Sequence, residues 1–111
     1  MNGIRPISKK RFKQLREYTK LKDIFREKCG NVSELSGDNP DWQTTFNAEP
    51  HHITGRTGEK LINPFNVILV TRLEHIELQS KMNWDKKREL LAFIKPIRIA
   101  QGYNINDYRP L

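Results

Sequence analysis

The fold of this chain is decided by two short stretches, EPHHITGR at residues 49–56 and NVILVTRLEH at residues 66–75. Together they contain all three histidines of the 111-residue sequence. Adjacent side chains on an extended segment point to opposite sides, so His51 and His52 cannot perform the same task. One of them can face a metal ion while the other faces a substrate. His75 would then supply a second metal ligand from the next element.

The segments around these stretches predict a hairpin followed by a helix. Residues 42–49 are rich in strand-forming side chains and lead into a strand that ends at the histidine pair. Residues 54–60 contain two glycines and predict a loop. Residues 66–71 form an apolar run that predicts a second strand or a strand-to-helix transition, and residues 72–80 can be helical.

A long basic helix is predicted before the hairpin, over about residues 8–29. Ser8 can cap its N-terminus, and Gly30 is a natural stop signal. Nine lysines and arginines against three acids lie in this segment, so its outer surface should be positive. Apolar side chains at three- and four-residue spacing are expected to face the core: Phe12, Leu15, Tyr18, Leu21, Ile24, Phe25 and Cys29.

The segment after the hairpin predicts C-terminal helices over about residues 83–102. Asn83 can cap a helix from Trp84 to Lys95, which Pro96 is expected to interrupt. The inward face of this helix is expected to contain Leu90, Leu91, Phe93 and Ile94. The order helix, strand, strand, helix, helix predicts a small α+β fold in a single domain over residues 1–111.

Composition narrows the functional classes. The formal net charge of +7 favours polyanionic partners, although a solvated lysine-rich helix without a partner has the same composition. The longest apolar stretch, residues 66–70, is far shorter than the roughly 20 residues of a membrane span. The first residues contain no apolar signal region, and Cys29 is the only cysteine. We therefore expect a cytoplasmic protein with no membrane partner.

The two stretches resemble the HNH motif of the ββα-metal endonucleases. In that family a metal-binding residue precedes a general-base histidine, an asparagine opens the second strand, and a metal-binding histidine lies on the following helix. The matching positions here, with similar spacing, are His51, His52, Asn66 and His75. The loop sequence HHITGRTG is also similar to small phage-encoded members of the family. The resemblance covers about residues 46–80 closely and the basic helix more loosely.

This resemblance implies a metal-dependent endonuclease that hydrolyses phosphodiester bonds of DNA. His52 would take a proton from the attacking water as the general base. His51 and His75 would hold one divalent cation that stabilises charge on the phosphate and on the departing oxygen. Asn66 would hold the loop that aims the base, and Arg56 could contact a phosphate as a bidentate donor. The structural alternatives are a turn residue for Asn66 and a solvent-exposed loop arginine for Arg56.

One position departs from the family pattern. Many members carry a histidine or asparagine one helical turn after the last motif histidine, where this sequence has Gln79. A glutamine oxygen can bind a hard cation but is a poor zinc ligand. The implied cofactor is therefore Mg²⁺ or Mn²⁺, with Zn²⁺ or Ni²⁺ as alternatives, and Gln79 is a candidate third ligand. The same departure leaves room for an impaired enzyme.

DNA is the expected partner, with RNA as an alternative, and a homodimer or a phage protein complex stays open as the working form. The nucleic-acid contacts are expected from Arg56, Lys60, Lys9, Lys10, Arg11, Lys13 and Arg16. Two other functions stay open. One is an HNH-like module that grips nucleic acid without cutting it, and the other is a small interaction protein whose histidines bind structural zinc.

Overall fold

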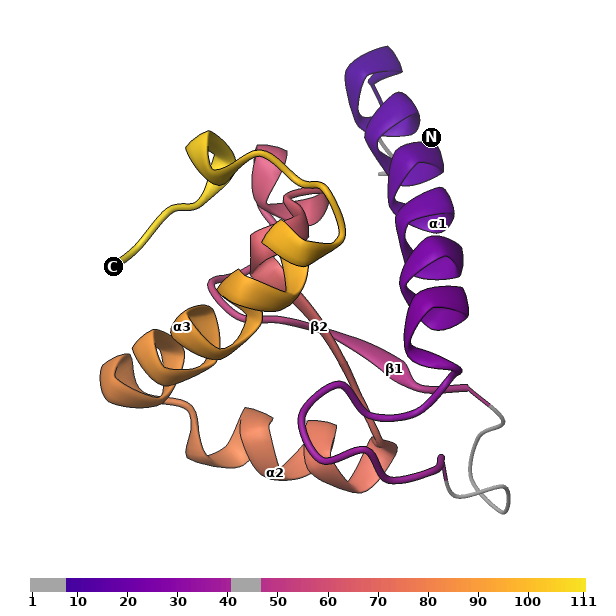
Figure 1. Ribbon diagram of the computed structural model, residues 1–111. Coiled ribbons are helices and arrows are strands. Elements are labelled where there is room, and N and C mark those ends of the chain that lie inside the picture. The colour runs from indigo at the N-terminus through magenta and orange to yellow at the C-terminus, as the bar shows by residue number, and fades with distance from the viewer. Residues whose placement is uncertain (1–7, 41–46) are drawn as a thin grey trace, which may run out of the picture.

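The computed structural model describes residues 8–40 and 47–111 of the chain. A two-stranded antiparallel sheet lies between one long helix on one side and two helices on the other (Figure 1). The strands are β1 (Glu49–His52) and β2 (Val67–Val70), and the helices are α1 (Lys9–Cys29), α2 (Arg72–Lys81) and α3 (Trp84–Ala100). The short 3-10 helices are η1 (Gly58–Leu61), η2 (Pro64–Asn66) and η3 (Ile105–Asp107). The predicted α+β class is confirmed.

Strand β2 is buried on both faces, which explains its unbroken run of apolar residues. It pairs with β1 so that His52 lies opposite Val67 and His51 lies opposite Ile68. One core cluster contains Ile68 and Val70 of β2 with Ile53, Leu78, Leu90, Leu91 and Ile94. The second cluster contains Val67 and Leu69 of β2 with Phe25 of α1 and Ala48. A strand between two cores has no solvent face, so it carries no alternating polar residues.

Helix α1 begins and ends where the sequence predicts. The Ser8 hydroxyl oxygen accepts a hydrogen bond from the Arg11 backbone N–H at 3.1 Å. Gly30 ends the helix in the left-handed conformation, with a φ of 69°, which glycine adopts without steric cost. These two signals are local, so the sequence alone suffices to predict both ends.

The predicted apolar face of α1 is only partly correct. Phe12 is 55% exposed and Ile24 is 41% exposed, so the prediction that both face the core is wrong. Tyr18 and Phe25 are buried as predicted, and Gln14, which was not predicted, is buried with them. The helix surface that contacts the rest of the protein is therefore rotated away from Phe12 and Ile24, and one buried position is polar.

Helix α3 is longer than predicted. Asn83 caps it as expected, and its side-chain oxygen accepts a backbone N–H at 2.9 Å. The helix runs through Pro96 to Ala100, so the predicted interruption is wrong. A proline inside a helix costs about 3 kcal/mol, and the turn after Pro96 contains Arg98, whose side chain is fully buried. Phe93 is 39% exposed, so its predicted inward position is also wrong.

Arg98 forms a buried ion pair with Glu34 that joins α3 to the loop after α1. The two side chains are 0% and 2% exposed, and their paired N···O distances are 2.6 and 2.7 Å. The Arg98 guanidinium also donates to the carbonyl oxygens of Pro64 at 2.9 Å and Val67 at 2.8 Å. The Glu34 carboxylate accepts the Leu69 backbone N–H at 2.9 Å. Each charge is thus compensated by its partner and by the backbone next to β2.

The connections between elements differ in detail from the prediction. The predicted loop at residues 54–60 contains the start of η1, and Asn66 ends η2 instead of opening β2. Residues 42–46 of the predicted lead-in to β1 lie outside the described residues. None of the helices in the described ranges is long and apolar enough to cross a membrane.

Candidate functional site

Strand β1 holds the histidine pair between two helices. The ring of His51 lies beside that of His75 on α2, with ring centroids 5.2 Å apart, and the ring of His52 lies beside that of Tyr18 on α1, also at 5.2 Å. The neighbouring side chains thus have different surroundings, as alternation along a strand predicts. Both line one hollow of about 430 Å³, which we call the histidine cavity. Its lining consists of Pro50, His51, His52, Ile53, Gly55, Arg56, His75, Gln79, Met82 and Lys87.

Asn66 holds the loop after the histidine pair through four hydrogen bonds. Its Oδ1 accepts from the backbone N–H of Thr54 at 2.8 Å and from the Thr54 hydroxyl at 2.7 Å. Its Nδ2 donates to the carbonyl oxygens of Gly55 and Lys60, both at 2.9 Å. Asn66 is only 5% exposed, so these bonds are shielded from competing water. This one side chain therefore ties both ends of the loop from Thr54 to Lys60 together.

The His52 ring is oriented by the end of the same loop. Its Nε2 lies 3.1 Å from the carbonyl oxygen of Leu61. Because a carbonyl oxygen only accepts, Nε2 carries the hydrogen and Nδ1 of the neutral ring keeps its lone pair. Burial lowers the pKa of His52, the hydrogen bond to Leu61 acts in the opposite direction, and the positive charge of Arg56 lowers it further. The ring is therefore neutral near pH 7 and can accept a proton at Nδ1.

His51 contributes a ring nitrogen that has no partner. The residue is 5% exposed, and its Nε2 is buried with no hydrogen bond to any described residue. Burial lowers the pKa of His51 to about 4, and the neighbouring His75 and His52 add to the effect. An unsatisfied buried polar group costs about 1–3 kcal/mol. A ligand at this nitrogen would remove that cost, and a neutral histidine is the form that binds metals.

Glu49 orients His75 from the same face of β1 as His51. It lies two residues before His51, and side chains two apart on a strand share a face. Its Oε2 lies 3.0 Å from His75 Nδ1, and its Oε1 accepts a hydrogen bond from Arg72 at 3.1 Å. Burial alone would raise the pKa of Glu49, but the hydrogen bonds from His75 and Arg72 outweigh it and lower the pKa. A carboxylate at Nδ1 leaves Nε2 of His75 available to a metal ion.

The remaining polar lining of the cavity comes from Arg56, Gln79 and Lys87. The Arg56 guanidinium lies 5.5 Å from the centroid of the Tyr18 ring. Within residues 8–40 and 47–111, no three side chains of His, Cys, Asp or Glu gather in a group that could hold a metal ion. The candidate ligands that line the cavity are His51, His75 and the amide oxygen of Gln79, a set that would leave several positions for water and substrate.

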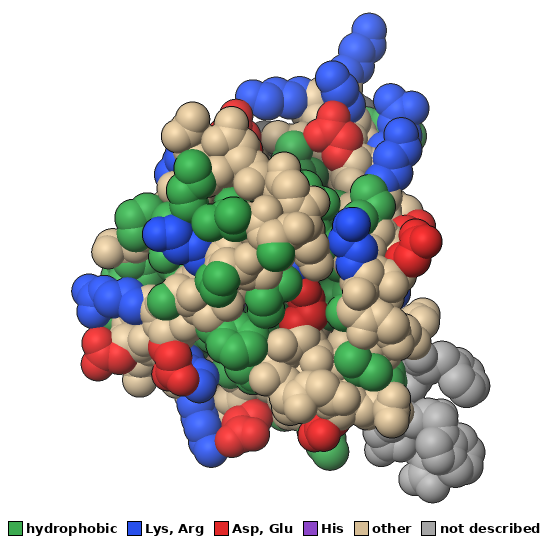
Figure 2. Space-filling view, viewed as in Figure 1, with side chains coloured by type: hydrophobic (Ala, Val, Ile, Leu, Met, Phe, Trp, Pro, Cys, Tyr) green, Lys and Arg blue, Asp and Glu red, His purple; other side chains and the backbone are tan. Residues whose placement is uncertain are grey.

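The basic residues predicted on α1 lie along the molecule's edge, where Lys and Arg side chains gather over this helix (Figure 2). Lys10 and Arg11 line a second hollow of about 530 Å³ together with Arg56, which also lines the histidine cavity. Lys9 is exposed, Lys13 lies 4.0 Å from Glu17, and the Arg16 guanidinium lies 5.4 Å from the ring centroid of Phe12. Of the five predicted helix residues, Lys10 and Arg11 are therefore the two that line this second hollow beside Arg56.

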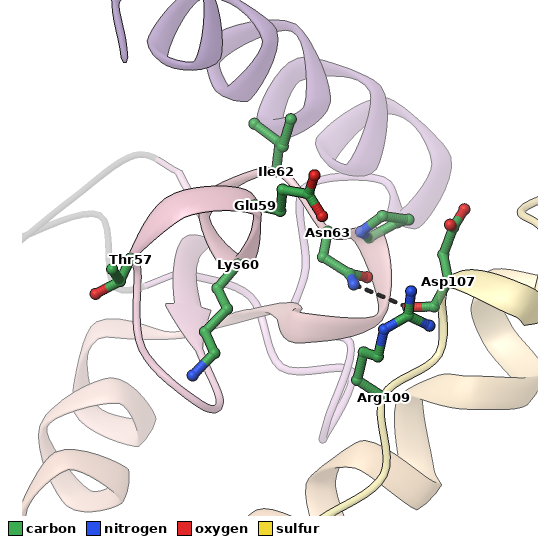
Figure 3. Close-up of a pocket in the computed structure, with 8 residues that line it drawn as sticks. Thr57, Glu59, Lys60, Ile62, Asn63, Asp107 and Arg109 are labelled. Atoms are coloured by element: carbon green, nitrogen blue, oxygen red, sulfur yellow. Dashed lines mark hydrogen bonds between the residues drawn. The ribbon is translucent and has the colours of Figure 1, made fainter. Parts of the chain in front are cut away.

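Lys60 lies apart from this arrangement. It lines a third hollow of about 760 Å³ between the η1 segment and the C-terminal segment (Figure 3). Asn63 and Arg109 also line it, and the Asn63 Nδ2 donates to the Asp107 carbonyl oxygen at 2.8 Å. The structure thus brings Arg56 and Gln79 together with the three histidines but does not bring Lys60 to the histidine cavity.

Sequence reasoning missed three residues of the site. Glu49 could have been found, because it lies two residues before His51 in a predicted strand and must share its face. Met82 and Lys87 line the cavity because of how α2 and α3 meet. No local pattern encodes that angle, so the sequence gives no signal for them.

The chain was compared with protein-family models, with curated proteins and with solved structures, and none of them matches it.

Proposed function

We propose that this chain is a metal-dependent endonuclease with an HNH-type ββα-metal core, which hydrolyses phosphodiester bonds of DNA. In this proposal β1, β2 and α2 form the motif, His52 is the general base, and His51 and His75 hold one divalent cation. Gln79 is a third candidate ligand. The order of hairpin and helix, and the positions of the histidines on them, support this assignment.

The geometry of His52 supports its role as the base. A general base needs a lone pair directed at the site and a pKa that leaves it unprotonated at working pH. The Leu61 carbonyl oxygen binds Nε2, so the free lone pair of His52 is at Nδ1. Burial lowers the pKa of the ring, which keeps it neutral. Asn66 contributes indirectly, because it fixes the loop that leads to Leu61.

The donor set also fits a metal ion. His51 offers a buried nitrogen without a partner, and Glu49 holds Nδ1 of the neighbouring His75, whose Nε2 is then available. These are the two features expected of histidine ligands supported by a carboxylate. When bound, a divalent cation would stabilise negative charge on the phosphate and on the departing oxygen. The coordination positions left to water and phosphate oxygens favour Mg²⁺ or Mn²⁺, and the two histidine nitrogens keep Zn²⁺ or Ni²⁺ as alternatives.

The residues of this chain then act as follows. His52 Nδ1 removes a proton from a water molecule, whose oxygen attacks the phosphorus of the scissile phosphate. The guanidinium of Arg56 holds a phosphate oxygen at the rim of the cavity. The oxygen on the opposite side of the phosphorus departs with the bonding electron pair and takes up a proton from solvent water. The proton held by His52 then passes to solvent, which regenerates the base.

One observation carries the proposal: all three histidines line a single cavity. There His52 is neutral and oriented by the Leu61 carbonyl oxygen, and His51 has an unpartnered Nε2 and lies beside His75. Incubation of the purified protein with supercoiled plasmid tests it. We expect nicked or linear DNA with Mg²⁺ or Mn²⁺ and intact plasmid with a chelator. Intact plasmid across Mg²⁺, Mn²⁺, Zn²⁺ and Ni²⁺ would contradict the proposal.

The second candidate is a module that binds nucleic acid without cutting it. The small ligand set favours it, because two histidines and one glutamine hold a cation weakly. Binding of DNA that weakens with added salt, together with an intact plasmid under every metal condition, would favour this alternative over the nuclease.

A further inference from the structure

A large exposed aromatic ring contacts a lysine that belongs to the lining of the histidine cavity. Trp84 is the first residue of α3 and is 62% exposed. The Nζ of Lys87 lies 5.1 Å from the centroid of the Trp84 ring, and Lys87 is also part of the lining of the histidine cavity. One lysine side chain therefore connects the exposed ring to the candidate catalytic site.

Among the described residues, no acidic side chain forms an ion pair with Lys87. Its neighbours Lys86 and Arg88 pair with carboxylates of their own helix at 3.5 and 3.2 Å. Lys87 forms no ion pair with any residue of the described ranges, and the same holds for Arg56, which lines the same cavity. Two cations without acidic partners at one cavity are suited to bind the phosphates of one strand.

The geometry points to Trp84 as a stacking platform for an unpaired nucleobase of the bound DNA strand, with Lys87 on the adjacent phosphate. This inference rests on the proposed function, because it assumes that a phosphate of that strand occupies the histidine cavity. Aromatic side chains stack on any base face, and a lysine binds a phosphate as a point charge.

The inference specifies a class of substrate. Bases inside a duplex are paired and stacked, so their faces are open to a tryptophan only after unstacking, which costs a few kcal/mol. The site should therefore prefer single-stranded DNA, or a strand with unpaired bases next to the cut, over an intact duplex.

The fluorescence of Trp84 tests the inference without requiring catalysis. The chain has two tryptophans, so Trp42→Phe leaves Trp84 as the only one. We titrate this variant with oligothymidylate in the presence of a chelator and follow emission, while anisotropy of a labelled oligonucleotide reports binding independently. Stacking should quench the emission in a saturable way. Bound oligonucleotide without quenching, or no binding, would overturn the inference.

Affinities in the otherwise unchanged chain provide a second test. Because stacking of one base contributes about 1–3 kcal/mol, Trp84→Ala should weaken binding of oligothymidylate by roughly 5- to 150-fold. Trp84→Phe should retain most of the affinity, and a blunt duplex should bind both variants nearly as well as the parent. Leu73→Ala is the matched control, because Leu73 is 70% exposed on α2 and does not line the cavity.

The outcomes separate this inference from the proposed function. Equal loss of duplex and oligonucleotide affinity in Trp84→Ala, or no loss in either, would overturn the stacking platform. If the parent cuts plasmid and Trp84→Ala binds oligothymidylate as well as the parent does, the nuclease proposal stands and only the stacking platform is overturned. Quenching by a protein that cuts nothing would instead support the platform on a module that binds DNA without cutting it.

Discussion

Replacing Asn66 by alanine removes four hydrogen bonds at one buried position, and the cost can be worked out from the structure. The amide of Asn66 is bonded to Thr54, Gly55 and Lys60 at 2.7–2.9 Å, and the residue is 5% exposed. A hydrogen bond contributes about 0.5–1.5 kcal/mol net to stability. The loop groups that lose their partner recover part of this stability by binding water, so we expect the free energy of unfolding to fall by about 2–4 kcal/mol. The total free energy of unfolding of a small domain is about 5–15 kcal/mol, so the variant should still fold.

Urea denaturation followed by far-ultraviolet circular dichroism measures this loss. Amide hydrogen exchange adds a local readout, because the Thr54 N–H donates to Asn66 and should exchange faster in the variant. Asn63→Ala is the matched control: its side chain makes two hydrogen bonds near the surface, so its loss should be about 1 kcal/mol. A loss below about 0.5 kcal/mol in Asn66→Ala, with Thr54 still protected, would refute the reasoning.

Three further predictions concern the ion pair and the candidate metal ligands. Arg98→Met leaves the buried carboxylate of Glu34 uncompensated and should lower the free energy of unfolding by about 3–5 kcal/mol in urea; an unchanged midpoint would contradict it. Burial lowers the pKa of His51 to about 4 from the ordinary 6.5. Between pH 4 and pH 6.5 the His51 ring is therefore protonated in the unfolded chain and neutral in the folded protein. The free energy of unfolding of the metal-free protein should therefore fall by up to about 3 kcal/mol as pH falls from 6.5 to 4, and His51→Gln should lack this loss. Parallel plots of unfolding free energy against pH for the two proteins would disprove that His51 has the lowered pKa. Glu49→Gln should weaken divalent-metal binding about 10–100-fold in calorimetry, because the carboxylate no longer supports His75; equal affinities would show that Glu49 has no such role.

Local signals in the sequence predict much of the fold. Ser8, Gly30 and Asn83 mark helix ends because caps satisfy backbone groups within one turn. The apolar run of β2 predicts a strand, although its burial on both faces depends on two helices that pack from opposite sides. The different surroundings of His51 and His52 follow from strand geometry alone.

Tertiary contacts decide the parts that the sequence could not predict. Pro96 is a local stop signal, but helix α3 continues past it to Ala100, and Arg98 in this last turn pairs with Glu34, a partner 64 residues away. The exposure of Phe12 depends on which face of α1 meets the sheet. Lys87 reaches the histidine cavity because of how α2 and α3 meet, which no short motif encodes.

The rate of plasmid cleavage by His52→Ala tests the central claim most directly. With Mn²⁺ present and the DNA saturated with protein, the parent should nick the plasmid, and the variant should be slower by about 100-fold or more, since general-base catalysis contributes about 10²–10⁴-fold. Binding of the DNA should change little, because Nδ1 of His52 acts on water and not on the strand. Cleavage by His52→Ala at the rate of the parent would contradict the assignment of His52 as the base.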